Sequence, residues 1–60
     1  MMFEELYKLN NKILTPSELD ILWENEAIES IENLGSSGFY LNKIWYVVNL
    51  INGTNINVYV

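Results

Sequence analysis

Carboxylates are the most frequent side chains in this sequence that could transfer a proton, since it has eight acids but no histidine or cysteine. The commonest general base and the most reactive nucleophile of enzymes are therefore missing. Two carboxylate pairs, Asp20 with Glu24 and Glu29 with Glu32, have the spacing of neighbours on a solvated helix surface. We therefore expect a protein that is not an enzyme.

Motifs for metals and cofactors are equally sparse. The acids do not form an Asp-x-Asp-x-Asp-Gly calcium loop, and a structural zinc site would need cysteine or histidine. Gly35 and Gly38 flank two serines, whereas the glycines of a phosphate-binding loop precede a helix. We expect neither a metal nor a cofactor.

The charge is negative and unevenly distributed. The net charge is -5, with three lysines and no arginine, and every acid lies within the first 32 residues. These acids are Glu4, Glu5, Glu18, Asp20, Glu24, Glu26, Glu29 and Glu32. Nucleic acids and anionic membranes require clustered basic residues, so we expect neither as a direct partner. A basic protein surface would be attracted.

Two helices are predicted in the first half of the chain. Residues 2–12 carry apolar side chains at helical spacing, which predicts a short amphipathic helix. Thr15-Pro16-Ser17-Glu18 is a capping box with proline in the first turn, so a second helix should begin there. Gly35 is typical of a helix C-cap, which predicts an acidic helix over residues 16–34.

The apolar pattern of this longer helix leaves two interpretations open. One stripe contains Leu19, Trp23, Ala27, Ile31 and Leu34. Ile21 and Ile28 fall on nearly the opposite side. Either one helix contacts other elements on two sides, or it breaks near Asn25 into two shorter helices.

The uncharged segment 44–60 predicts a β-hairpin. A two-residue turn at Asn52-Gly53 would mix apolar and polar side chains on both faces. A three-residue loop over residues 51–53, with Gly53 in the left-handed conformation, sorts them cleanly. Val48 then opposes Ile56 on the core face. Trp45 opposes Tyr59 on the other.

Residues 39–41 are predicted to add a third strand through a turn at residues 42–43; a continuous strand over 39–50 is the alternative. The predicted core face contains Phe39, Leu41, Ile44, Tyr46, Val48, Leu50, Ile56, Val58 and Val60. The predicted opposite face contains Tyr40, Trp45, Val47, Asn49, Asn55, Asn57 and Tyr59. The expected fold is thus a single α+β domain over residues 1–60, with two helices and then an antiparallel β-meander of two to three strands.

The size of the chain favours a role in protein–protein interaction. Sixty residues bury a thin core, and neither a disulfide nor zinc is there to reinforce it. The uncharged terminal strand is expected to be a free edge, and tryptophan and tyrosine are favoured interface residues. The predicted partner-binding residues are Tyr40, Trp45, Val47, Tyr59, Glu18, Glu29 and Glu32.

We therefore expect a non-enzymatic interaction module that forms a homo-oligomer through its C-terminal sheet and binds or inhibits a partner protein. Its composition is typical of an AT-rich bacterial or phage genome. The alternative is an acidic nucleic-acid mimic, with Glu18, Glu29 and Glu32 presented on one side of the long helix. A cytoplasmic location is expected, because the first residues are acidic and no apolar run approaches the ~20 residues of a membrane span.

Overall fold

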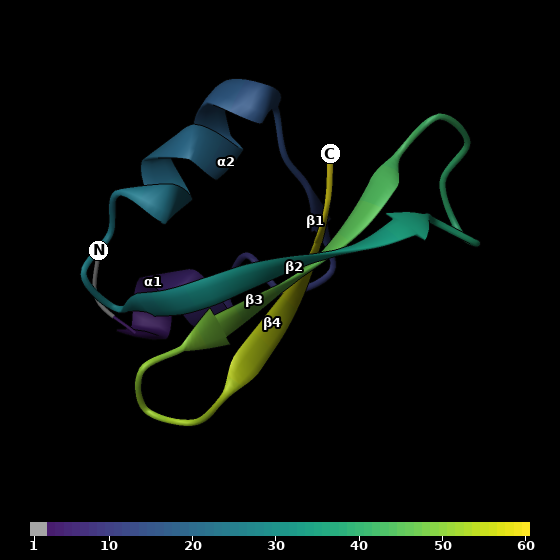
Figure 1. Ribbon diagram of the computed structural model, residues 1–60. Helices are drawn as coiled ribbons and strands as arrows, with labels where there is room; N and C mark the ends of the chain where they lie inside the picture. Colours follow the sequence, from purple (N-terminus) through teal and green to yellow (C-terminus); the bar gives the residue numbers. More distant parts are fainter. Residues whose placement is uncertain (1–2) are drawn as a thin grey trace.

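The computed structural model describes residues 3–60, which form two helices and four strands (Figure 1). The elements follow the chain in the order α1 (Phe3–Tyr7), β1 (Lys12–Ile13), α2 (Pro16–Trp23), β2 (Ile28–Ser36), β3 (Ile44–Leu50) and β4 (Asn55–Tyr59). The predicted α+β class is confirmed, although the sheet has more strands than the two to three expected. Neither helix in residues 3–60 has the length and apolar composition that crossing a membrane requires.

The four strands form one mixed sheet in the order β1-β4-β3-β2 (Figure 1). β1 runs parallel to β4, and the other neighbouring pairs are antiparallel. Side chains from both helices and from one face of the sheet form a single buried cluster. Its members are Leu6, Leu14, Leu19, Leu22, Val48, Leu50, Ile56 and Val58. Both helices therefore contribute to the core on the same face of the sheet.

The C-terminal hairpin has the predicted register. Val48 pairs with Ile56, and Trp45 pairs with Tyr59. Gly53 has a φ of 89°, the left-handed conformation expected at the end of a three-residue loop. Val48 and Ile56 are both buried, so the sorting of side chains between the two faces is confirmed for the centre of the hairpin.

The start of α2 has the predicted capping box. The backbone N–H of Thr15 donates to Oε1 of Glu18 at 2.9 Å, and the backbone N–H of Glu18 donates to Oγ1 of Thr15 at 3.2 Å. Pro16 occupies the first turn, where its missing N–H costs no hydrogen bond. Two free N–H groups of the helix end are thereby satisfied without help from the rest of the fold.

The first helix is shorter than the predicted range of residues 2–12. α1 ends at Tyr7, and Asn11 adopts a left-handed φ of 65° that leads the chain into β1. The N–H of Asn11 donates to the carbonyl of Asn57 at 2.6 Å, which ties this turn to β4. The predicted start at Met2 lies outside the described residues.

The predicted helix over residues 16–34 is wrong beyond Trp23. α2 ends there and Ile28–Ser36 is strand β2, so neither the single helix nor the pair of helices is correct. The chain does turn at Asn25, whose Oδ1 accepts the N–H of Ala27 at 2.8 Å. A strand follows because β3 would otherwise leave one edge unpaired, and pairing along that edge outweighs local helix propensity.

Gly35 has the left-handed conformation of a C-cap glycine, with a φ of 88°, but it lies in a β-bulge. The irregularity falls between Asn33 and Ser36, and the N–H of Gly35 donates to Oδ1 of Asn33 at 2.8 Å. Helix ends and β-bulges both use left-handed glycine, so the residue alone could not distinguish between them.

Residues 37–43 form the loop between β2 and β3, so both strands predicted here, 39–41 and 39–50, are wrong. β2 occupies the edge of β3 that a strand at 39–41 would have needed. Phe39 and Leu41 are consequently not core residues: they are 81% and 91% exposed.

β4 is not the free edge that the sequence predicted, because β1 covers its outer side. The N–H of Leu14 donates to the carbonyl of Tyr59 at 2.7 Å, next to the parallel pairing of β1 with β4. The long free edge belongs to β2, where two bulges interrupt the regular pairing. Bulges and the charged Glu29 and Glu32 disfavour the addition of another strand to this edge.

Replacing Gly53 by alanine tests the three-residue loop. No atom lies within 4 Å of a Cβ placed at this position, so the cost comes from the left-handed backbone alone. We expect the free energy of unfolding to fall by about 1 kcal/mol. Gly38→Ala is the matched control, since Gly38 has equally open surroundings and no positive φ; its change should stay below about 0.5 kcal/mol. Urea denaturation measures both variants, and equal losses would contradict the loop geometry.

Candidate protein-binding surfaces

The seven residues predicted to bind a partner do not form one surface. Four lie together on the side of the sheet opposite the helices: Tyr40, Trp45, Val47 and Tyr59. Glu18 lies in the first turn of α2, while Glu29 and Glu32 lie in β2. The fold therefore brings these four residues together, and Glu32 lies beside them because it pairs with Val47 on the same face.

The three acids have separate environments. Glu18 is engaged in the capping box, where Oε1 accepts the N–H of Thr15. Glu29 lies at the bulge between Ile28 and Ser30, and Glu32 pairs with Val47 of β3. The shared helix side on which these acids were expected does not exist, because two of them lie on a strand.

The aromatic face is the sheet surface away from the helices, formed by Ile13, Phe39, Tyr40, Trp45, Val47 and Tyr59. Tyr59 is only 5% exposed, because two rings of the loop 37–43 pack on it. Its ring centroid lies 4.9 Å from that of Tyr40 and 6.4 Å from that of Phe39. Tyr59 therefore supports this surface from below, and the loop residues are the ones that a partner would touch.

Trp45 is held in position on the aromatic face. It is half-buried, and its Nε1–H donates to Oδ1 of Asn57 at 2.9 Å. Four residues further along β3, Nδ2 of Asn49 donates to Oγ of Ser30 at 3.1 Å, which links β3 to β2. The Trp45 indole and the Asn49 amide thus already donate within the chain, so that a partner could cover these two groups at little cost in hydrogen bonds.

Hydrogen bonds from backbone N–H groups to the Ser37 side chain and to a backbone carbonyl brace the exposed loop 37–43. Oγ of Ser37 accepts the N–H groups of Phe39 and Tyr40 at 3.0 and 3.2 Å. The N–H of Ser37 donates to the carbonyl of Lys43 at 2.9 Å and closes the base of the loop. Asn42 supplies the left-handed residue of the final turn, with a φ of 62°. The exposed rings and Leu41 are therefore presented by an ordered loop.

A hollow of about 280 Å³ lies on the aromatic face beside this loop, lined by Asn11, Phe39, Tyr40 and Tyr59. Aromatic rings on several sides make it suitable for an apolar side chain. Asn11 is the one polar residue among those lining it.

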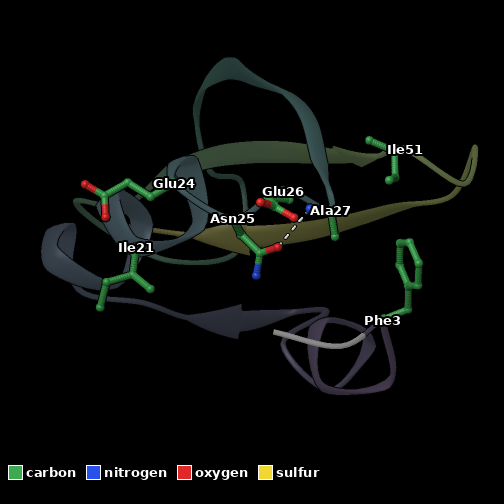
Figure 2. Close-up of a pocket in the computed structure, with 7 residues that line it drawn as sticks. All are labelled: Phe3, Ile21, Glu24, Asn25, Glu26, Ala27 and Ile51. Carbon is green, nitrogen blue, oxygen red and sulfur yellow. Dashed lines mark hydrogen bonds between the residues drawn. The ribbon is translucent and has the colours of Figure 1, made fainter.

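A second concave surface lies on the helix side of the molecule. This groove, of about 590 Å³, is lined by Phe3, Ile21, Glu24, Asn25, Glu26, Ala27 and Ile51. Figure 2 shows Phe3 and Ile51 facing each other at one end and Ile21 at the other, with the turn 25–27 between them. The sequence pattern did not identify this groove. The one feature of the sequence that could have indicated it was Ile21, an apolar residue outside the predicted apolar stripe of the helix.

A hydrogen-bond cluster next to the groove connects α1 to the hairpin loop. Nδ2 of Asn52 donates to the hydroxyl of Tyr7 at 2.7 Å, and Thr54 lies 3.4 Å from the same oxygen. Hydrogen bonds from Thr54 and from Asn52 lower the pKa of Tyr7 below its usual 10.0. The hydroxyl of Thr54 has one proton to donate, and its Oγ1 also lies 2.6 Å from a second acceptor, Oδ1 of Asn52. Because that nearer acceptor competes for the proton, we assign the larger part of the lowered pKa of Tyr7 to the Asn52 amide.

Comparison with known proteins adds no relative: no protein family model, no curated protein and no solved structure matches this chain significantly.

Replacing Tyr40 or Phe39 by serine tests which of the two loop rings stabilises the fold and which mainly offers exposed surface to a partner. Tyr40 packs closely on Tyr59, so its loss should lower the free energy of unfolding by about 1–2 kcal/mol. Phe39 is more exposed, so Phe39→Ser should lower the free energy of unfolding by less than about 0.5 kcal/mol. Urea denaturation at a concentration low enough to keep the chain monomeric measures both. A larger loss for Phe39→Ser would contradict the proposed support of Tyr59.

Titration of Tyr7 tests the hydrogen-bond cluster. Asn52→Ala should raise the pKa of Tyr7 back toward 10.0, whereas Asn55→Ala, which removes an amide elsewhere in the hairpin, should leave it unchanged. Because folding lowers this pKa, the cluster adds stability at pH values above 10.0, and this contribution is lost as pH falls through the lowered pKa. NMR of isotope-labelled tyrosine measures the pKa; an unchanged value in Asn52→Ala would contradict our assignment.

Proposed function

We propose that this protein is a non-enzymatic interaction module that self-associates through its aromatic face. The observation that carries the proposal is the ordered loop 37–43, which presents Phe39 and Leu41 to solvent beside a hollow lined by aromatic rings. A binding interface needs an aromatic or aliphatic side chain that anchors in a pocket, and aromatic residues are enriched among those that dominate binding energy.

The distribution of charge favours a second copy of the chain as the occupant. Six of the eight acids lie on the two helices or just after α2: Glu4, Glu5, Glu18, Asp20, Glu24 and Glu26. Glu32, which pairs with Val47 of β3, is the one acid that this strand pairing places on the aromatic face. Two chains of net charge -5 repel each other, and they can approach most closely through the face that carries the fewest acids.

The shape of this face is compatible with a two-fold contact. The loop supplies a projecting apolar side chain, Leu41, and the neighbouring hollow lined by Asn11, Phe39, Tyr40 and Tyr59 could receive one. In a symmetric dimer each chain contributes the same surface. Leu41 of each chain can therefore enter the hollow of the other. The thin core supplies the driving force, because association removes apolar surface from water that one chain cannot bury.

The fold gives less support to nucleic-acid mimicry. A mimic needs carboxylates spaced like phosphates along one surface, and the helix meant to carry Glu29 and Glu32 is a strand in this region. Inhibition of a host or partner protein stays a prediction of the sequence.

Sedimentation equilibrium over a range of concentrations tests self-association. We expect a monomer–dimer equilibrium, and Leu41→Ser should weaken the dimer about tenfold or more, as loss of a central anchor residue does. Leu41 is 91% exposed, so this variant should fold normally.

Ile51→Ser is the matched control. It also removes an exposed aliphatic side chain, but from the loop at the other end of β3, about 20 Å away. This variant should dimerise like the unchanged protein. A chain that stays monomeric at its highest soluble concentration, or equal weakening by both substitutions, would overturn the proposal.

A further inference from the structure

The groove on the helix side has apolar walls that the core of the protein does not use. Ile21 and Ile51 are 57% and 58% exposed, although Ile21 lies in α2 and the backbone N–H of Ile51 is bonded to the carbonyl of Ala27. Ile21 points away from the core because its neighbours in α2, Leu19 and Leu22, are the residues that enter it. We infer that this groove binds a cationic amphipathic segment of a second protein, with an apolar side chain between Phe3, Ile21 and Ile51.

The acidic residues of the groove favour a positively charged segment as the molecule that binds there. Glu24 and Glu26 both line the groove, and none of its lining residues within 3–60 is basic. The three lysines of the chain, at positions 8, 12 and 43, all lie elsewhere in the sequence. A carboxylate beside apolar walls attracts lysine or arginine, whose long aliphatic stem can also cover apolar surface. The negative charge disfavours a nucleic acid, so a protein segment fits better.

The groove is formed before any partner binds. The N–H of Ile51 donates to the carbonyl of Ala27 at 2.9 Å, which fixes the hairpin loop against the turn after α2. The Tyr7–Asn52 hydrogen bond fixes α1 against the same loop and so holds Phe3 opposite Ile51. Oδ1 of Asn25 is used in the turn through its bond to Ala27. A preformed site loses little conformational entropy on binding.

This inference does not rest on self-association, because the groove and the aromatic face use different residues on different sides of the sheet. If both hold, a dimer formed through the aromatic faces would carry two outward grooves for cationic segments. The Leu41→Ser variant therefore provides a monomer in which the groove can be tested alone.

NMR titration of the isotope-labelled Leu41→Ser variant with a short synthetic peptide of lysine and leucine at helical spacing tests the groove. We expect the largest shifts at Ile21, Ala27 and Ile51, and weaker binding at higher salt. Two further peptides are controls, one with glutamate in place of lysine and one with serine in place of leucine; neither should bind. Binding by the serine peptide equal to that of the leucine peptide, shifts centred on residues 37–43, or no binding at all would overturn the inference.

Charge reversal supplies a matched pair of variants. Glu24→Lys with Glu26→Lys should weaken binding of the lysine–leucine peptide about tenfold or more, a loss of about 1.4 kcal/mol. Glu29→Lys with Glu32→Lys changes the net charge by the same amount but alters β2, outside the groove. It should weaken binding far less. Equal effects of the two pairs would show that the peptide responds only to total charge and would contradict a site in the groove.

Discussion

The pairing of β3 with β4, in the register set by the loop at Gly53, sorts the apolar side chains of this protein into two faces. Val48 and Ile56 enter the core beneath the helices, while Trp45 and Tyr59 go to the opposite side. A slip of one residue would exchange the two sets. The rest of the fold follows from this division, because α1 and α2 can cover only one face of the sheet.

The loop 37–43 accounts for the second face, though only in part. Its rings remove Tyr59 from water, but they do so by exposing Phe39 and Leu41 in exchange. The molecule therefore still exposes apolar side chains on this side, on the loop 37–43 in place of the sheet. Among residues 3–60 no other helix or strand covers these side chains, and contact with a second polypeptide would remove them from water.

Much of the fold could be predicted wherever the decisive contacts are local. The capping box at Thr15 and the three-residue loop at Gly53 each depend on a few neighbouring residues. The segment 28–34 has apolar spacing that suits a helix or a bulged strand, and only its pairing with β3 decides between them. The groove could not be predicted at all, since it joins Phe3 and Ile51, which are distant in sequence. For the same reason, Glu29 and Glu32, two of the seven predicted contact residues, were placed on a helix although they lie in β2.

In our proposal, the aromatic face contacts a second copy of the chain, and the acidic groove on the helix side binds a cationic segment of another protein. Isotope-filtered NOE measurements on a mixture of labelled and unlabelled chains test the central claim most directly, since they detect contacts between copies alone. The account predicts intermolecular NOEs between Leu41 and the hollow formed by Phe39, Tyr40 and Tyr59, and none from Ile21 or Ile51. Intermolecular NOEs confined to the helix side, or their complete absence in a concentrated sample, would contradict it.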